Sequence, residues 1–329
     1  MKAQKMKAIV ATAYGNHEVL KVKQVEIPQV NENEILIKVV SSSATTADTM
    51  MISGKPYLSR LFMGFRKPKN EIPGTGFAGT VVFVGKKVNR FNVGDEVFGE
   101  TSLGFSSNAE YICVNENGVL LHKPDNLPFT EASSYCDGHL TSINFLKELA
   151  KIKPGQKVLI NGASGSLGTS AVQLAKYFGA EVTGVCSTTN AGLVKSLGAD
   201  FVIDYKKEDF TKSSKKYDII YDTLGKIPFR KAKKVLTHQG LYLSPVLKFG
   251  LLLSMLRTSV FGNKKASFAA TGLKAHDQLK KLLNELLDIF QSGHLRTVID
   301  RQFPLDKVAQ AHQYIGTGHK KGNVVIVVE

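Results

Sequence analysis

The stretch that decides the fold is Lys157-Val-Leu-Ile-Asn-Gly-Ala-Ser-Gly-Ser-Leu-Gly168, a short apolar run followed by glycines. Apolar residues then recur at helical spacing, at Leu167, Ala171, Leu174, Ala175 and Phe178. A strand, a glycine loop and a helix in this order are the context in which such a loop binds a dinucleotide. A tight turn that holds no ligand is the alternative.

The residues of this loop have separate expected roles. Ala163 stands at the first glycine of the usual pattern, Gly165 lets the backbone approach a pyrophosphate, and Gly168 allows the helix to pack closely on the strand. The N–H groups at the helix N-terminus attract the phosphates.

The end of the second strand indicates which dinucleotide is bound. NAD sites place Asp or Glu about 20 residues after the glycines, where the carboxylate binds the ribose 2′-hydroxyl. Here the strand Glu181–Val185 is followed by Cys186-Ser-Thr-Thr-Asn190, which contains no carboxylate. Small hydroxyls remove the repulsion against a 2′-phosphate and can donate hydrogen bonds to it. We therefore expect NADP(H).

The pattern of predicted strands and helices changes twice along the chain. At 329 residues it is long enough for two domains. The first part, to about residue 125, is β-rich and glycine-rich, and beyond about 128 strands alternate with helices, which predicts a doubly wound parallel sheet. The C-terminal segment most simply returns to the first domain. The expected strands are 35–40, 80–84, 109–114, 157–161, 181–185, 201–203, 217–221, 240–244 and 323–328, and the expected helices 191–197, 278–291 and 305–316.

Composition excludes several classes of protein. The chain is 43% hydrophobic and 22% charged and contains three cysteines, which excludes a disordered chain, a disulfide scaffold and a four-cysteine zinc site. No apolar stretch approaches the about 20 residues of a membrane span. The first residues contain no apolar run typical of a signal peptide, so we expect a cytoplasmic protein.

Motifs from one end of the chain to the other carry a family resemblance. In order they are Asn33-Glu-Ile-Leu36, Ala47-Asp48, Ile72-Pro-Gly-Thr-Gly-Phe-Ala-Gly79, Val93-Gly-Asp-Glu-Val97, Lys153-Pro-Gly-Gln-Lys-Val-Leu159, the glycine loop, Leu197-Gly-Ala-Asp200 and Gly318-His-Lys-Lys-Gly322. In this order they resemble the zinc-independent quinone oxidoreductase branch of the medium-chain dehydrogenase/reductase superfamily.

The resemblance implies a fold, an assembly and a set of site residues. It implies a GroES-like β-barrel catalytic domain, 1–127 and 270–329, split around a Rossmann NADP(H)-binding domain, 128–269. Members of the family usually form dimers or tetramers, and we expect a homodimer. The implied catalytic residues are Thr45, Asp48 and Thr141, although Thr45 and Asp48 could equally serve as local turn caps. The implied cofactor-binding residues are Ser164, Gly165, Ser166, Leu167, Ser187, Thr188, Tyr205 and Asp222.

The zinc ligands of related enzymes are missing from their positions. The first falls in Ser41-Ser-Ser-Ala-Thr-Thr46, without a cysteine, and the second in Gly74-Thr-Gly-Phe77, without a histidine. We therefore expect no metal. Without a Lewis acid the substrate must already be electrophilic, which fits a quinone or an α,β-unsaturated carbonyl. Solvent or the cofactor ribose could supply the proton.

The positive charge of the chain suggests an alternative function of a different class. The net charge is +15, and residues 223–276 contain ten Lys or Arg and no Asp or Glu. An NADPH-binding protein whose main role is RNA binding is the alternative function, but no RNA-binding motif is present, so nucleic acid is not the expected partner. The expected partner is a small lipophilic electrophile.

The segment 248–271 leaves the interpretation open. Phe249, Leu252, Leu253, Leu256 and Val260 can share one helical face. A packed helix that covers the cleft or forms a subunit contact is one reading, and a peripheral contact with an anionic membrane is the other.

Overall fold

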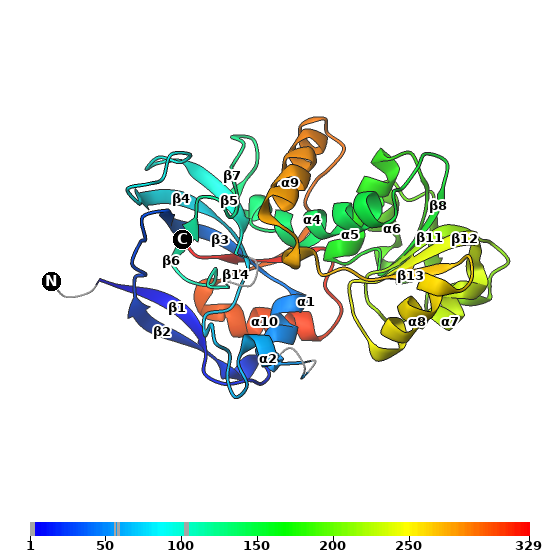
Figure 1. Ribbon diagram of the computed structural model, residues 1–329, viewed down its shortest axis with the longest axis horizontal. Helices are drawn as coiled ribbons and strands as arrows, with labels where there is room; N and C mark the ends of the chain where they lie inside the picture. The colour runs from blue at the N-terminus through cyan, green and yellow to red at the C-terminus, as the bar shows by residue number, and fades with distance from the viewer. Residues whose placement is uncertain (1–3, 56, 58–59, 102–104) are drawn as a thin grey trace. The chain divides into compact units, whose positions relative to one another are not determined.

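The computed structural model describes residues 4–55, 57, 60–101 and 105–329, and the chain divides into two compact units (Figure 1). The first unit spans residues 1–137, 272–281 and 297–329, and the second spans 138–271 and 282–296. The domain boundaries expected after residues 127 and 269 stay a prediction. The compact units divide nearby, after 137 and 271, and the second also takes in 282–296.

The second unit contains the expected parallel sheet. Residues 138–271, all of them described, form six strands in the order β10-β9-β8-β11-β12-β13, and every neighbouring pair is parallel. The strands are β8 (Lys157–Asn161), β9 (Glu181–Cys186), β10 (Phe201–Asp204), β11 (Tyr217–Asp222), β12 (Leu236–Leu243) and β13 (Lys265–Ser267). This is the doubly wound Rossmann order, whose direction reverses between β8 and β11. Ligands bind outside the carboxyl ends of the strands at that reversal.

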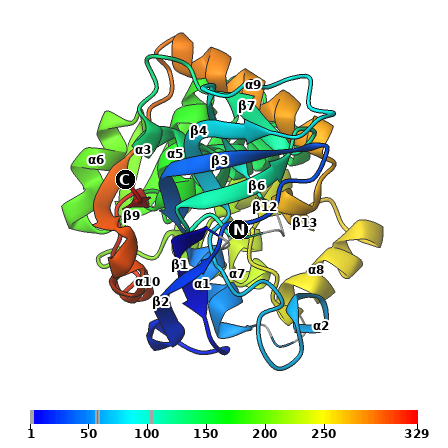
Figure 2. The same ribbon diagram turned by 90° about the vertical axis from the view of Figure 1, so that its left-hand side faces the viewer.

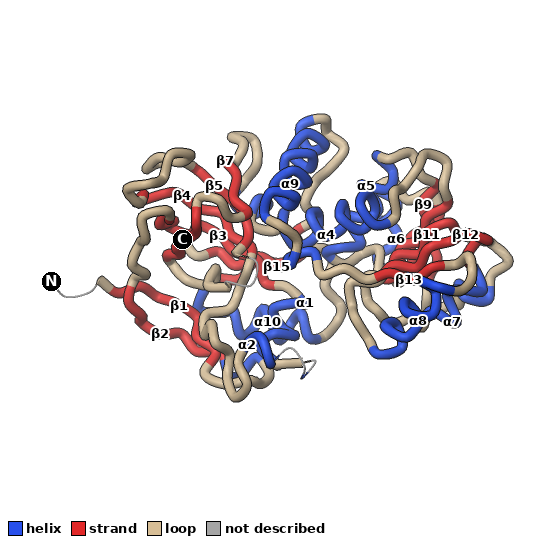
Figure 3. Tube along the Cα trace, viewed as in Figure 1, coloured by secondary structure: helices blue, strands red, loops and turns tan. Residues whose placement is uncertain are grey.

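Helices cover both faces of this sheet (Figures 1 and 3). The figures show α5 (Ser166–Tyr177) and α6 (Ala191–Ser196) on one side, and α7 (Phe229–Ala232) and α8 (Phe249–Val260) on the other. The strands are apolar because both of their faces are covered. A cluster that includes Leu159, Ile220, Tyr242 and Leu251 fills the α7 and α8 side.

The first unit is β-rich, as expected. Among its described residues, a seven-stranded sheet has the order β14-β15-β3-β4-β5-β7, with β6 also paired to β3, and β1 pairs with β2. The strands are β1 (Lys5–Ala11), β2 (Leu20–Glu26), β3 (Glu34–Ala44), β4 (Gly76–Val84), β5 (Glu96–Glu100), β6 (Tyr111–Asn115), β7 (Val119–His122), β14 (Ile299–Pro304) and β15 (Asn323–Val327).

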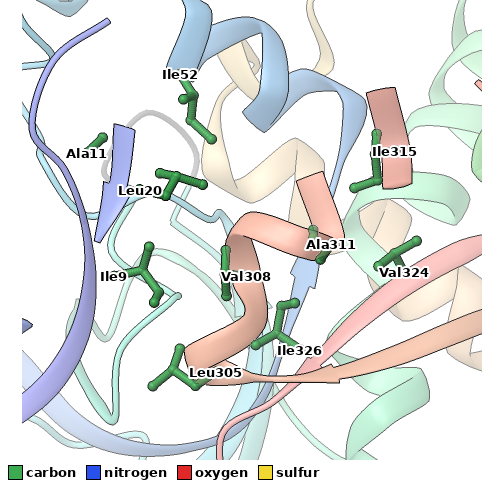
Figure 4. Packing of buried hydrophobic residues seen from close by; sticks show 11 residues of the cluster. Ile9, Ala11, Leu20, Ile52, Leu305, Val308, Ala311, Ile315, Val324 and Ile326 are labelled. Atoms are coloured by element: carbon green, nitrogen blue, oxygen red, sulfur yellow. The ribbon is translucent and has the colours of Figure 1, made fainter. Parts of the chain in front are cut away.

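The C-terminal segment returns to the first unit, as the sequence predicts. Strand β15 pairs antiparallel with β3, and α10 (Val308–Gly316) lies over α1 (Thr46–Ser53). Figure 4 shows the buried cluster to which Ile52 of α1, Val308 of α10 and Ile326 of β15 belong. This packing holds α1 in the first unit, and the first turn of that helix carries two of the expected site residues.

The remaining helices are short or connect the units. They are α2 (Arg60–Met63), α3 (Phe129–Ala132), α4 (Leu140–Ile143) and α9 (His276–Gln291). In the part of the chain that the structure describes, no helix has the length and apolar character to span a bilayer.

Candidate functional site

The glycine loop joins β8 to α5 and leaves open space at the first turn of the helix. Gly162 has φ +78°, and a Cβ there would lie 2.6 Å from Thr223 Oγ1, so a side chain is excluded. A Cβ on Gly168 would lie 2.1 Å from the carbonyl oxygen of Gly162, so the helix packs directly on the loop. A Cβ on Gly165 would meet only that same oxygen, at 3.5 Å.

The tight turn differs from the expectation by one residue. The sequence pattern assigns the first glycine position to Ala163, but the positive φ falls on Gly162. Ala163 is fully buried, and its Cβ would lie 3.1 Å from a Cβ built on Gly184 of β9. The methyl group at 163 therefore fills the contact with the neighbouring strand, and the turn itself belongs to Gly162.

The N-terminus of α5 fits a pyrophosphate. Its N-cap is Gly165, in an extended conformation, so no side chain caps the first turn. Ser164 and Ser166 are buried at this turn, and the carbonyl oxygen of Leu167 accepts a hydrogen bond from Ser142 Oγ at 2.9 Å. An open N-terminus without a capping side chain offers N–H groups and a partial positive charge to an anion.

Hydroxyl and amide groups follow the end of β9. Ser187 Oγ lies 3.0 Å from Thr189 Oγ1, and Asn190 Nδ2 donates to Ser164 Oγ at 3.0 Å. The second bond ties the end of β9 to the glycine loop. Asn190 Oδ1 is buried and has no hydrogen-bond partner among the described residues. The four side chains thus form a polar edge at the position where the sequence predicts the adenosine ribose.

A carboxylate that the spacing rule misses lies beside this edge. Thr188 Oγ1 donates a hydrogen bond to Asp204 Oδ2. Strand β10 runs parallel to β9 and places Asp204 opposite Cys186, so the carboxylate arrives from the third strand and not from the second. The bond from Thr188 and a backbone bond from Lys206 lower the pKa of Asp204. Tyr205, which follows, is 55% exposed.

Asp222 lies where the strand order of the sheet reverses, and both of its carboxylate oxygens accept hydrogen bonds from other groups of the protein. Its Oδ1 accepts from Asn161 Nδ2 at 2.8 Å, and its Oδ2 accepts from the backbone N–H of Ile227 at 2.7 Å and from Tyr242 Oη at 2.9 Å. The side chain is fully buried. These bonds fix the loops after β8 and β11, so this carboxylate shapes the edge of the sheet.

Thr141 lies in the same unit as the glycine loop. It sits half-buried on α4, between the π-helical turns Tyr135–His139 and Asn144–Leu149. Helix α4 packs against α5. The neighbouring His139 is buried, and burial lowers its pKa to about 3, so this imidazole is neutral at physiological pH.

Thr45 and Asp48 form a reciprocal cap at the start of α1. Thr45 Oγ1 accepts from the backbone N–H of Asp48 at 2.9 Å. Asp48 Oδ2 accepts from the backbone N–H of Thr45 at 2.9 Å and from its hydroxyl at 2.8 Å. The local capping that the sequence left open is therefore present. Both side chains are nonetheless buried, at 2% and 1% exposure, which is unusual for a surface helix cap.

Asp48 also lines a cavity. The cavity has a volume of about 220 Å³, and its wall is largely apolar, with contributions from Met51, Ile52, Met63 and Pro73. Burial raises the pKa of the Asp48 carboxyl from 3.8 to about 7; the bonds from Thr45 oppose this shift. Asp48 Oδ1 has no hydrogen-bond partner among the residues that the structure describes. The cavity thus contains a carboxyl group that exchanges a proton near neutral pH.

The expected catalytic residues divide between the two units. Thr45 and Asp48 lie together in the first, and Thr141 lies in the second. Their meeting around one substrate stays a prediction.

The positions of the missing zinc ligands hold other partners. Ser42 Oγ donates to Asn108 Oδ1 at 2.8 Å, and Phe77 is fully buried in the sheet core. Within residues 4–55, 57, 60–101 and 105–329, no group of three His, Cys, Asp or Glu side chains is placed to hold a metal ion. Cys136 is buried, which raises the pKa of its thiol well above the ordinary value.

Comparisons with known proteins agree with both units. Residues 31–125 match the alcohol dehydrogenase GroES-like domain, and residues 197–326 match the family model described as zinc-binding dehydrogenase. A 2-methylene-furan-3-one reductase of Solanum lycopersicum is 36% identical over 98% of this chain and 79% of its own length.

Two further comparisons cover nearly the whole chain. An NADPH-dependent alkenal/one oxidoreductase of Arabidopsis thaliana chloroplasts is 33% identical over 98% of this chain and 80% of its own length. The solved structure of the quinone oxidoreductase from Coxiella burnetii has a TM-score of 0.88 at 28% identity, over 99% of this chain and all of its own. The chain belongs to the medium-chain dehydrogenase/reductase superfamily, in its quinone-oxidoreductase-like branch.

Proposed function

We propose that this protein is an NADPH-dependent reductase of quinones or α,β-unsaturated carbonyls that works without zinc. The observation that carries the proposal is the open N-terminus of α5 behind Gly162 and Gly165, a dinucleotide site in a chain similar to reductases of alkenals and quinones. The first unit is then the GroES-like catalytic part, and the second the NADP(H)-binding part.

The chemistry requires a hydride at an electrophilic centre and a proton at the site of developing negative charge. NADPH supplies the hydride when it is bound. Asp48 is the candidate proton donor, because it lines a largely apolar cavity, its Oδ1 has no hydrogen-bond partner among the described residues, and a pKa of about 7 leaves the carboxyl protonated in a large share of molecules at neutral pH. The hydroxyl of Thr45 holds the other oxygen, Oδ2, and so orients the carboxyl group.

Zinc independence rests on the chemistry of the side chains at the ligand positions. Ser42 and Phe77 lie in the segments where related enzymes have a cysteine and a histidine, and neither provides a soft or imidazole ligand. A substrate that needs no Lewis acid suits such a site.

NADPH is the proposed nucleotide, because Ser187 and Thr188 stand where a carboxylate would repel a 2′-phosphate. Asp204 acts against this preference, since it is bonded to Thr188 and carries a negative charge. The hydroxyl of Ser187 favours the phosphate, and so does the positive charge of Lys206, which follows Asp204 by two residues and acts on its carboxylate. A homodimer and a cytoplasmic location stay predictions.

The test is a set of initial rates with NADPH against quinones, alkenals, alkenones and alcohols. We expect turnover of the quinones and activated alkenes, and none of the alcohols with NADP⁺. Activity confined to alcohols would refute the proposal. The RNA-binding alternative predicts instead a steep dependence of RNA affinity on salt and no turnover; the relatives reported above carry reductase names and give it no support.

A further inference from the structure

Helix α8 is apolar on two opposite sides. Its inner side faces the sheet, where Leu251 is 8% exposed and belongs to the cluster with Tyr242 and Ala266, and Met255 packs against that cluster. Thr258 is also buried on this side, and its hydroxyl accepts from the backbone N–H of Ala266 at 3.2 Å. The inner side is enough to fix the helix on β13.

The opposite side forms the outer face of α8, made of Phe249, Leu252, Leu253, Leu256 and Val260. At 100° per residue these five positions span about 100° of the helix. They are 40–77% exposed, and Phe261 directly after the helix is 69% exposed. Figure 2 shows the helix in yellow, beside β12 and β13 of its own unit. A contiguous apolar face of this kind marks an interaction surface more often than a solvated one.

A basic margin, made of Lys216, Lys233, Lys264 and Lys265, borders the C-terminal end of the helix. Lys264 Nζ donates to the carbonyl oxygen of Lys233 at 2.8 Å, and Lys265 Nζ donates to that of Thr258 on α8. Lys216 Nζ donates to the carbonyl oxygen of Lys234, the residue after Lys233, at 2.8 Å, so the three lysines are tied to the same turn of chain. Burial, together with the charges of Lys216 and Lys233, lowers the pKa of Lys264.

The sequence around helix α8 contains no acidic residue. Residues 223–276 contain no Asp or Glu, and no carboxylate in the described part of the chain forms an ion pair with any of the four lysines. Lys248, at the other end of the helix, adds another cation. The outer face therefore lies between positive charges, which selects an anionic partner.

A second copy of the chain is a poor occupant for this face. A two-fold contact would place the same face on both subunits. Whichever way the two helices ran, the cations at one end would meet cations of the other copy, and residues 223–276 offer no carboxylate to pair with them. A bilayer with anionic headgroups meets both requirements, since it takes apolar side chains at the acyl boundary and lysines at the headgroups.

We propose that the outer face of α8 and its basic margin dock the protein on an anionic lipid bilayer. This inference goes beyond the proposed reductase function and does not depend on it. Turnover is not needed for its test.

The first experiment uses the absence of tryptophan from the chain. Leu253→Trp places a single reporter on the outer face, and Leu273→Trp, at a position that is 67% exposed in the first unit, is the matched control. With vesicles that contain phosphatidylserine, the emission of Leu253→Trp should shift to the blue and be quenched by brominated acyl chains. The control should do neither, and neutral phosphatidylcholine vesicles should leave both unchanged.

Vesicle sedimentation then tests each component. Leu252→Ser with Leu256→Ser should lower partitioning more than about tenfold, because two apolar side chains no longer enter the bilayer. Leu273→Ser should leave it unchanged. Lys233→Glu with Lys264→Glu should weaken binding much more than Lys21→Glu with Lys23→Glu, which changes the net charge equally on β2. All of these side chains are exposed or half-buried, and circular dichroism checks that each variant is folded.

Three results would overturn the proposal. One is no binding of the wild type to anionic vesicles. Another is equal loss of binding in the two charge-reversed pairs, which would mean attraction by net charge alone. The third is a dimer, seen by sedimentation equilibrium, that dissociates in Leu252→Ser with Leu256→Ser, because a second copy would then cover the face.

Discussion

Asp48→Asn removes the ionisable proton of this side chain and keeps its size and shape. Asn keeps an oxygen that accepts from the N–H and the hydroxyl of Thr45, the two bonds made by Asp48 Oδ2 at 2.9 and 2.8 Å. It cannot ionise, and it places an amide nitrogen in the position of Oδ1. The cap at the start of α1 should therefore persist, and the helix should still form.

The magnitude follows from the pKa, which burial raises from 3.8 to about 7. The neutral carboxyl of the folded protein therefore adds to the free energy of unfolding. This contribution is complete below about pH 4 and is lost as the pH rises through about 7. About three pKa units correspond to about 4 kcal/mol, an upper figure for the change in unfolding free energy. The wild type should thus lose stability between pH 4 and 8, relative to Asp48→Asn, by up to that amount.

The assay is urea unfolding followed by circular dichroism at several pH values between 4 and 8. Asp125→Asn, which removes an exposed carboxylate from the same unit, is the matched control and should show no such relative change. If the difference in unfolding free energy between the wild type and Asp48→Asn is the same at pH 5 and pH 8, the carboxyl is not held neutral and the reasoning fails. If Asp48 is the proton donor, kcat should also fall about 100-fold while the Kd for NADPH stays unchanged.

Three further predictions concern the nucleotide edge and the metal. Ser187→Asp should lower kcat/KM with NADPH about tenfold or more, because it places a carboxylate against the 2′-phosphate. The value of kcat/KM with NADH should change little. Equal kcat/KM with both nucleotides in the wild type would contradict the assignment of NADPH. Asp222→Ala should lower the thermal midpoint of unfolding and weaken the binding of NADPH and NADH alike, since it leaves Asn161 and Tyr242 without this hydrogen-bond partner. A loss of affinity for only one of the two nucleotides would indicate direct contact with Asp222. Activity should survive exhaustive chelation, and loss of activity that Zn²⁺ restores would disprove zinc independence.

The parallel sheet could be predicted because its signals are local. Each strand is a short apolar run, and each helix follows at the 3.6-residue period, so 157–161, 181–185 and 217–221 match β8, β9 and β11 almost residue for residue. The return of the last strand to the first unit followed from the change of pattern near the end of the chain. The strands and helices depend on neighbours in sequence, whereas the pairing of β15 with β3 joins segments about 280 residues apart.

The cavity beside Asp48 could not be predicted, because its wall comes from separate segments. Ala11, Met63 and Pro73 meet there only after the first unit has folded. The capping pattern of Thr45 and Asp48 is visible in the sequence, but the burial that raises the pKa is not. Asp204 was missed for a similar reason, since its place beside Thr188 depends on the pairing of β10 with β9.

For helix α8 the hydrophobic pattern does not predict which side of the helix is buried. A helix with one apolar face reveals which side is buried, whereas α8 has Leu251 and Met255 inside and Leu252 and Leu256 outside. The pattern located the outer face correctly as a set. Only the structure distinguishes it from the side that packs on the sheet.

Hydride transfer to an activated alkene is the central claim, and isotope labelling tests it most directly. NADPH that carries deuterium at C4 of the nicotinamide is incubated with the enzyme and an α,β-unsaturated ketone, and the product is analysed by mass spectrometry and NMR. The account predicts a saturated ketone with one deuterium at the β carbon for each NADPH oxidised. An allylic alcohol with deuterium at the carbonyl carbon, or no label in any product, would contradict it.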